Sequence, residues 1–324
     1  MKVCIYGAGA IGGWIGSRLA RAGCHVSVVA RGATLDALQL HGLRLHQGEH
    51  FASHGVASSA SPEDFGVQDL VVLAVKAPSL PEVVDHIAPL IGPNTLVLTA
   101  MNGVPWWFLQ GFGGALANRR LISVDPDGAL AKAIPAAHII GCVVHASCSV
   151  DEPGLVHHHF GNSLILGEPS GEKTARLLQL AALLEKAGFD VPVSEQIQKD
   201  IWFKLWGNMT VNPISALTGA TTDLIMADDL VRGFISSVML EAKEIGARIG
   251  IQIDQRPEDR HQVTLKLGAF KTSMLQDVEA GKALELDALV AAVRELGQLT
   301  GVATPFTDAL LGLARLKAQV HGLY

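Results

Sequence analysis

The sequence predicts an α/β fold in two parts, an N-terminal domain built on a parallel sheet and an all-α C-terminal domain. Short β-branched runs alternate with helical patterns over the first half of the chain, as in parallel sheets with crossover helices. Beyond residue 174 the pattern is almost entirely helical. A length of 324 residues also favours two domains over one. We therefore expect one domain at residues 1–193 and a second at residues 194–324.

The N-terminal half contains short apolar runs typical of buried strands, at residues 2–6, 25–30, 70–75, 95–100 and 137–144. Between them, residues 10–22 and 80–91 have the apolar spacing of helices. Farther on, residues 155–160 and 163–166 predict a hairpin that turns at Gly161 and Asn162, because Gly and Asn suit hairpin turns. These strands would complete the sheet with an antiparallel edge.

The C-terminal half predicts helices at residues 174–187, 196–212, 231–250, 261–275 and 286–300. Only residues 189–192 interrupt this pattern, as a last short strand. Pro213 disfavours helical geometry at the residue before it, so the second of these helices is expected to end or kink at Asn212.

The composition argues against several classes of partner. Charged residues make up 17% of the chain and the net charge is −6, with no basic stripe or tail, which argues against nucleic acid. No apolar run is long enough to span a membrane, and no signal-peptide pattern is present. The four cysteines include no C-x-x-C pair and are expected to be reduced. We expect a cytoplasmic protein that acts on a small molecule, with a homodimer as a possible assembly.

A glycine-rich motif directly follows the first predicted strand and opens the first predicted helix. Gly7, Gly9 and Gly12 have the G-x-G-x-x-G spacing. Gly7 permits a tight turn, Gly9 lets a pyrophosphate approach the backbone, and Gly12 allows close packing of the helix, whose N-terminus faces the anion. The domain is therefore predicted to be a Rossmann domain that binds a dinucleotide through Gly7, Ala8, Gly9, Ala10, Ile11 and Gly12.

The residue after the second strand indicates which dinucleotide is bound. NAD-binding domains place Asp or Glu about 20 residues past the glycine turn, where it binds the ribose 2′-hydroxyl. This chain has Arg31 there, and its first acidic residue is Asp36. Because a guanidinium suits a 2′-phosphate, we expect NADP(H). The alternative is that Arg31 is an ordinary exposed arginine.

Two polar residues follow predicted strands at the edge where ligands bind in open α/β sheets. Lys76 comes directly after the third strand, and Asn102 follows the fourth and precedes a glycine. We expect both to contact the cofactor. Each could equally be an ordinary polar residue at the end of a strand.

A polar stripe runs along an otherwise apolar helix in the C-terminal half. Lys204, Asn208 and Asn212 are four residues apart, so they share one helix face. Buried polar groups need partners, and a substrate is one possible partner. Alternatively, the stripe is an exposed face and the tryptophans beside it lie in the core.

At this point the sequence resembles the ketopantoate reductase family, that is, the 2-dehydropantoate 2-reductases. The resemblance covers the whole chain, and the two C-terminal motifs are the most specific. Its elements are, in order, the glycine motif, Arg31, Lys76, Asn102-Gly103, the Lys204-x-x-x-Asn208-x-x-x-Asn212-Pro213 helix, and Ser273-Met-Leu-Gln-Asp277 followed by Glu285.

The resemblance implies NADPH-dependent reduction of a 2-oxo acid, with 2-dehydropantoate giving pantoate. Lys204 resembles the general acid that protonates the ketone oxygen. Ser273 resembles the hydroxyl that binds the substrate carboxylate, and Glu285 the carboxylate that contacts the substrate hydroxyl and the lysine. Asn102, Asn208 and Asn212 resemble the amides that orient substrate and cofactor.

Some residues depart from the family pattern. Met101 replaces the usual Gln, a bulky run that includes Trp106 and Trp107 follows, and Thr222 stands where some members have Asn. These differences indicate either another 2-oxo acid or ketone, or packing. The adjacent histidines at residues 157–159 point to opposite faces of a strand, so no metal is expected.

Two other functions remain open. A β-hydroxyacid dehydrogenase would share the two-domain plan and a helix-borne lysine, but the first helix lacks the Met-Ala typical of those enzymes. A non-catalytic NADP-sensing protein would have no need of Lys204, Ser273 and Glu285 together.

Overall fold

The computed structural model describes all 324 residues, which form two compact units. Unit 1 comprises Met1–Met101 and Gly128–Ile197, and unit 2 comprises Asn102–Asp127 and Gln198–Tyr324. The chain therefore passes between the units three times, whereas we expected one boundary at residue 194. The segment Asn102–Asp127 belongs with the helices because its apolar side chains pack there, a long-range contact that local sequence patterns do not show.

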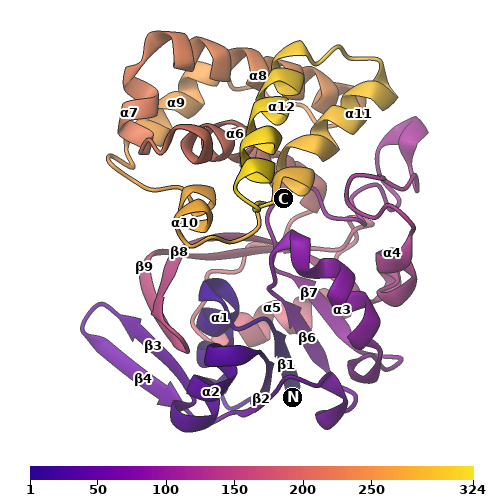
Figure 1. Cartoon of the computed structure of the whole chain (residues 1–324). Helices are drawn as coiled ribbons and strands as arrows, with labels where there is room; N and C mark the ends of the chain where they lie inside the picture. Colours follow the sequence, from indigo (N-terminus) through magenta and orange to yellow (C-terminus); the bar gives the residue numbers. More distant parts are fainter. The chain divides into compact units, whose positions relative to one another are not determined.

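Unit 1 is built on one nine-stranded sheet (Figure 1). Its strands are β1 (Lys2–Tyr6), β2 (His25–Val29), β3 (Leu43–Gln47), β4 (His50–His54), β5 (Ala57–Ser59), β6 (Leu70–Leu73), β7 (Leu96–Thr99), β8 (Ile139–Glu152) and β9 (Leu155–Gly167). They lie in the order β4-β3-β9-β8-β7-β6-β1-β2-β5. The run from β8 to β5 is entirely parallel and follows the strand order of a Rossmann fold. The predicted fold class is confirmed.

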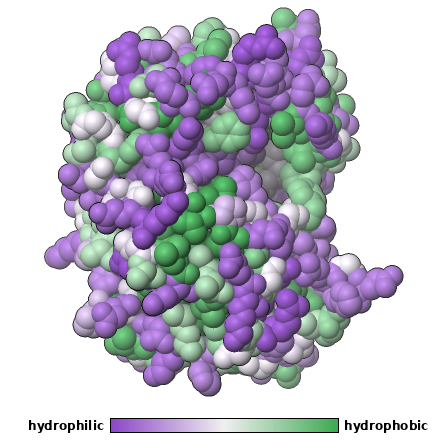
Figure 2. Space-filling view, turned by 180° about the vertical axis from the view of Figure 1, so that it is seen from behind, coloured by the Kyte–Doolittle hydropathy of each residue, from purple (hydrophilic) through white to green (hydrophobic).

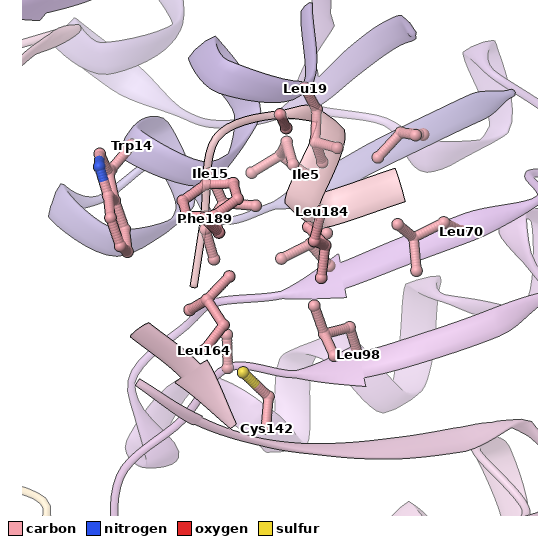
Figure 3. Close-up of a cluster of buried hydrophobic side chains, with 14 of the residues drawn as sticks. Ile5, Trp14, Ile15, Leu19, Leu70, Leu98, Cys142, Leu164, Leu184 and Phe189 are labelled. Atoms are coloured by element: carbon pink, nitrogen blue, oxygen red, sulfur yellow. The ribbon is translucent and has the colours of Figure 1, made fainter. Parts of the chain in front are cut away.

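Two helices and alternate strand residues bury one face of this sheet. The helices of unit 1 are α1 (Ala10–Arg21), α2 (Gly32–His41), α3 (Leu80–His86), α4 (Ala129–Ala133) and α5 (Ala175–Lys186). Figure 3 shows Ile15 of α1 and Leu184 of α5 beside Ile5, Leu70 and Leu98 from three strands. Because strand side chains alternate between faces, every second residue of these strands belongs to this core.

The predicted hairpin at Gly161 is wrong. Strand β9 runs unbroken through this point and pairs antiparallel with β8, and the turn between them lies at Pro153 and Gly154. The register shifts by one residue beside Gly161, which has φ +80°. Gly161 therefore forms a β-bulge, which uses the same positive φ as a hairpin turn.

Unit 2 is helical. Its helices are α6 (Ile197–Thr218), α7 (Thr222–Ala227), α8 (Asp229–Arg248), α9 (Pro257–Leu265), α10 (Ser273–Glu279), the π-helical segment η6 (Asp287–Ala291), α11 (Ala292–Thr300) and α12 (Pro305–Val320). Two indoles join α6 to α8: Trp202 donates to the Ala242 carbonyl at 3.2 Å, and Trp206 donates to the Met239 carbonyl at 2.7 Å. These bonds fix the rotation of α6 about its axis.

Two helix boundaries differ from those predicted. Helix α6 continues past Pro213 to Thr218, because buried neighbours such as Ile214 hold it in place despite the lost backbone donor. The predicted helix at residues 261–275 is two helices, α9 and α10, with Gly268 at φ +63° between them. The Thr272 hydroxyl caps α10 by accepting from Leu275 N at 3.2 Å.

The surface is largely polar on the side that Figure 2 shows, with apolar side chains gathered in smaller areas. None of the helices combines the length and the apolar character needed to cross a membrane.

Candidate functional site

The glycine turn lies at the switch point of the sheet, between β1 and β6. Gly7 has φ +97°, and its amide donates to the Val29 carbonyl at 3.1 Å. A Cβ on Gly12 would lie 2.0 Å from the Gly7 carbonyl oxygen, so only glycine fits there. A Cβ on Gly9 would meet nothing within 4 Å. The space above Gly9 is therefore open, as an approaching ligand requires.

The N-terminus of α1 suits an anion. Gly9 is the N-cap residue, no side chain caps the helix, and its first turn contains no acidic residue. Amide groups at the start of a helix have no partner within it, and the helix dipole adds positive charge there. This geometry fits the pyrophosphate of a dinucleotide.

Arg31 is the N-cap residue of α2 and forms an ion pair with Glu82 of α3. Both side chains are exposed. The pKa of the Tyr6 hydroxyl is raised, first by burial and then by the negative charge of Glu82, while the positive charge of Arg31 opposes this shift. The three side chains therefore lie near one another, at the ends of their elements. The expected 2′-phosphate ligand of Arg31 would have to compete with Glu82.

Lys76 lies beside the glycine turn. It follows β6 by three residues and is the N-cap residue of a short 3-10 helix. The residue before it, Val75, packs against Gly7 so closely that a Cβ on Gly7 would be 2.7 Å from its methyl group. The strand-end lysine and the glycine turn therefore belong to one edge of the sheet in unit 1.

In unit 2, Lys204 and Asn102 lie in direct contact although they are 102 residues apart in sequence. The Lys204 ammonium donates to the Asn102 amide oxygen at 2.8 Å, and both residues are half-buried. Two residues that the sequence singled out separately therefore form one polar pair, with Lys204 on α6 and Asn102 at the start of the segment Asn102–Asp127.

Asn102 is held by a close backbone contact. Gly103, with φ +83°, lies against Ala288 of η6, where a Cβ would be 2.6 Å from the Ala288 carbonyl oxygen. The next residue, Val104, donates its amide to that same oxygen at 2.8 Å. A π-helical turn changes which backbone groups bond within the helix, and such turns are frequent at functional sites. Glu285, only 5% exposed, lies just before this turn.

The rest of the segment Asn102–Asp127 is anchored at two further points. Glu295 of α11 accepts from the amides of Ile122 and Ser123, each at 2.8 Å. The Phe108 ring packs on Trp202 of α6, with ring centroids 5.9 Å apart. The segment is therefore packed into unit 2 along its length, and these contacts hold the turn that carries Asn102.

The other expected site residues occupy different places. Asn212 is 8% exposed and Asn208 is half-buried, so the stripe on α6 is not an exposed face. Ser273 is the first residue of α10 and half-buried. No hydrogen bond joins Ser273 to Lys204.

Two of the departures from the family pattern have packing roles. Trp106 and Trp107 are buried at 4% and 1% exposure in the core of their segment. The Thr222 hydroxyl donates to the Gly268 carbonyl at 2.6 Å and accepts from Phe270 N at 3.3 Å, which ties α7 to the segment between α9 and α10.

Sequence reasoning named Gly103 without giving it a packing role, and it missed Arg260. The role of Gly103 depends on Ala288, far along the chain. Arg260 of α9 has its guanidinium 5.6 Å from the centre of the Phe203 ring on α6. Neither contact has a local signal in the sequence.

Comparison with known proteins decides the family. The model of the family "Ketopantoate reductase PanE/ApbA" matches residues 3–171, and the model of its C-terminal domain matches residues 196–318. The chain belongs to the ketopantoate reductase family. Members of this family are oxidoreductases, and the suspected resemblance is confirmed.

Relatives match this chain over its full length. A 2-dehydropantoate 2-reductase from Mesorhizobium japonicum is 47% identical over 325 residues, which is 100% of both chains. A structure from Ralstonia solanacearum MolK2, assigned to the ketopantoate reductases, is 55% identical with a TM-score of 0.94 and covers 99% of each chain. A D-mandelate dehydrogenase solved with NADH shares the fold, with a TM-score of 0.85, 22% identity and complete coverage of both chains.

Gly9→Ala should weaken binding of the dinucleotide without unfolding the protein. Its backbone is extended and the added methyl group meets nothing in the ligand-free chain, so the melting temperature should hardly change. The dissociation constant, measured by titration calorimetry, should rise about tenfold to 10²-fold, equivalent to one lost hydrogen bond to a charged group. Gly12→Ala is the contrasting variant and should destabilise the fold. Unchanged affinity in Gly9→Ala would place the pyrophosphate elsewhere.

Gly103→Ala should impair both stability and turnover. The new Cβ cannot fit against Ala288, so the turn must shift and carry Asn102 with it. A shift of about 1 Å can lower turnover about 10²-fold. Gly219→Ala is the matched control in the same unit, with a similar φ of +74° but open space around it. It should lose about 1–2 kcal/mol of stability from backbone strain and keep its turnover. Equal turnover in both variants would show that the contact does not position Asn102.

Proposed function

We propose that this protein reduces a 2-oxo acid to a 2-hydroxy acid with NADPH, and that 2-dehydropantoate is its substrate. The observation that carries the proposal is the Lys204–Asn102 pair, an ammonium group on an apolar helix that is oriented by an amide oxygen. The full-length similarity to a 2-dehydropantoate 2-reductase, at 47% identity, supports the choice of substrate.

Lys204 is the proposed general acid. A ketone that accepts hydride develops negative charge on its oxygen, and the bound nicotinamide supplies that hydride when NADPH is present. A positioned ammonium stabilises the charge and then delivers the proton. The bond to Asn102 holds the lysine in place, because the amide oxygen accepts from the ammonium at 2.8 Å. The catalytic pair therefore has both a proton donor and a group that orients it.

Neighbouring polar groups in unit 2 have supporting roles in this proposal. Glu285, which is 5% exposed, is proposed to bind the substrate hydroxyl and the lysine. Asn208 and Asn212 continue the polar face of α6 and orient the substrate, while the Ser273 hydroxyl binds its carboxylate. The burial of Asn212 and Glu285 supports these roles, because polar groups in the interior need partners.

Lys204→Ala should lower kcat by about 10²- to 10⁴-fold, the usual effect of removing a positioned acid. Cofactor affinity should change little, since the proposed dinucleotide ligands other than Asn102 lie in unit 1. The assay follows loss of the reduced nicotinamide absorbance with 2-dehydropantoate and a panel of other 2-oxo acids.

Lys199→Ala provides the control, because Lys199 is an exposed lysine on the same helix. It should retain wild-type kinetics. Normal turnover in Lys204→Ala would exclude the lysine as the acid, and an inactive wild type across the panel would exclude the reaction.

The proposed cofactor is NADP(H), held by the glycine turn and by Arg31, Lys76 and Asn102. An exposed guanidinium at the N-terminus of α2 and a lysine beside the turn both suit a phosphate. The ion pair with Glu82 keeps Arg31 at this edge until a phosphate replaces the carboxylate.

NADPH should bind at least about tenfold tighter than NADH, and Arg31→Ala should remove this preference. Titration of both cofactors into each protein gives the ratio. Glu82→Gln is the matched variant: it removes the competing charge, so it should preserve or increase the preference for NADPH. A ratio that Arg31→Ala leaves unaltered would mean that another group binds the 2′-phosphate.

A further inference from the structure

We propose that Arg260 binds the carboxylate of the substrate alongside the Ser273 hydroxyl, and so makes this enzyme selective for anionic 2-oxo acids over neutral ketones. The inference rests on the proposed function and adds a binding residue that lies outside the motifs shared with the family.

Arg260 is a half-buried cation without a partner. Its Nε–H is fully buried and has no acceptor, and no carboxylate forms an ion pair with its guanidinium. Burial lowers the pKa of this guanidinium, and no charged neighbour offsets that effect. A desolvated charge without a counter-ion destabilises the folded chain, so a ligand that supplies the negative charge is the natural complement.

A structural arginine in this chain shares the buried Nε–H without an acceptor but differs at its terminal nitrogens. Arg18, which is 5% exposed in unit 1, donates to the Gly188 carbonyl and the Gln47 amide oxygen, each at 3.0 Å, and to Asn162. Its guanidinium is thus tied to three acceptors. Arg260 has packing contacts but no such bonds, which argues against a purely structural role.

The guanidinium packs on α6, the helix that carries the proposed acid. It packs against Gly207, where a Cβ would be 2.7 Å from Nε and 3.0 Å from Nη2. Residues three apart on a helix are neighbours, so Gly207 lies beside Lys204 on the surface of α6, and it directly precedes Asn208. The absence of a side chain at residue 207 thus makes room for a guanidinium on α6, less than one helical turn from the backbone of Lys204.

Two features of this location match a 2-oxo acid. The carboxylate of a 2-oxo acid is bonded directly to the ketone carbon, so a group that binds this carboxylate must lie close to the proton donor. The guanidinium lies over the Phe203 ring, with its central carbon 5.6 Å from the ring centroid, and a carboxylate can accept two hydrogen bonds from such a planar group. Arg260 and Lys204 would then bind adjacent oxygens of one substrate.

The test compares 2-dehydropantoate with its lactone, which keeps the ketone and lacks the carboxylate. In Arg260→Met, which preserves the apolar stem over Phe203, kcat/KM for the acid should fall about 30-fold to 10³-fold, the range for losing one partner of a buried charge pair. With the lactone, kcat/KM should fall less than about threefold. Arg260→Lys should recover part of the kcat/KM that Arg260→Met loses with the acid. Arg248→Met, which removes an exposed arginine of α8, should behave as wild type.

A binding measurement separates this inference from the proposed reaction. Oxamate has a carboxylate and no reducible ketone, and its affinity for the protein with NADP⁺ bound should fall in Arg260→Met in parallel with kcat/KM. The melting temperature of the ligand-free variant should stay equal or rise, because an uncompensated charge is removed. An equal loss of activity with acid and lactone, or a lower melting temperature with unchanged oxamate binding, would overturn the inference. Failure of the wild type to reduce any 2-oxo acid while oxamate binding still depends on Arg260 would overturn only the proposed reaction.

Discussion

The positions of the proposed catalytic residues depend on a contact between two stretches of backbone that leaves no room for a side chain. Gly103 lies directly on Ala288, and the Val104 amide bonds to the same Ala288 carbonyl at 2.8 Å. This contact joins a segment from the middle of the chain to the helices that follow, and it places Asn102 where it accepts from Lys204. The chemistry proposed for α6 therefore depends on backbone packing as much as on the polar residues themselves.

Unit 1 contains a similar close contact at a glycine, and there it shapes the proposed cofactor site. Gly12 lies against the Gly7 carbonyl, which brings α1 close to β1 and leaves the N-terminus of the helix open above Gly9. In both units a glycine permits contact between backbones, and the functional groups take their positions from that contact. Gly207 extends the pattern, because the space it leaves on α6 is filled by a guanidinium rather than by backbone.

The sequence predicted what depends on local spacing. The glycine turn, Arg31 and the stripe from Lys204 to Asn212 are all short-range patterns, and the fold class follows from the alternation of strands and helices. Gly161 was misread because a bulge and a hairpin turn both use positive φ, and only the pairing partner distinguishes them. The helices α7 and α12 were not predicted at all.

Other features could not be predicted because their partners are distant in sequence. The Glu82 partner of Arg31, the Ala288 contact of Gly103 and the isolation of Arg260 exist only in the folded chain. The membership of Asn102–Asp127 in the helical unit is of the same kind, and it limits how this gene can be cut and recombined. A fragment that starts at residue 194 would carry the lysine without its amide partner, and the complementary fragment would carry Trp107 and Phe108 without the helices that cover them. Exchange of either half between relatives therefore requires two separate stretches of coding sequence to move together.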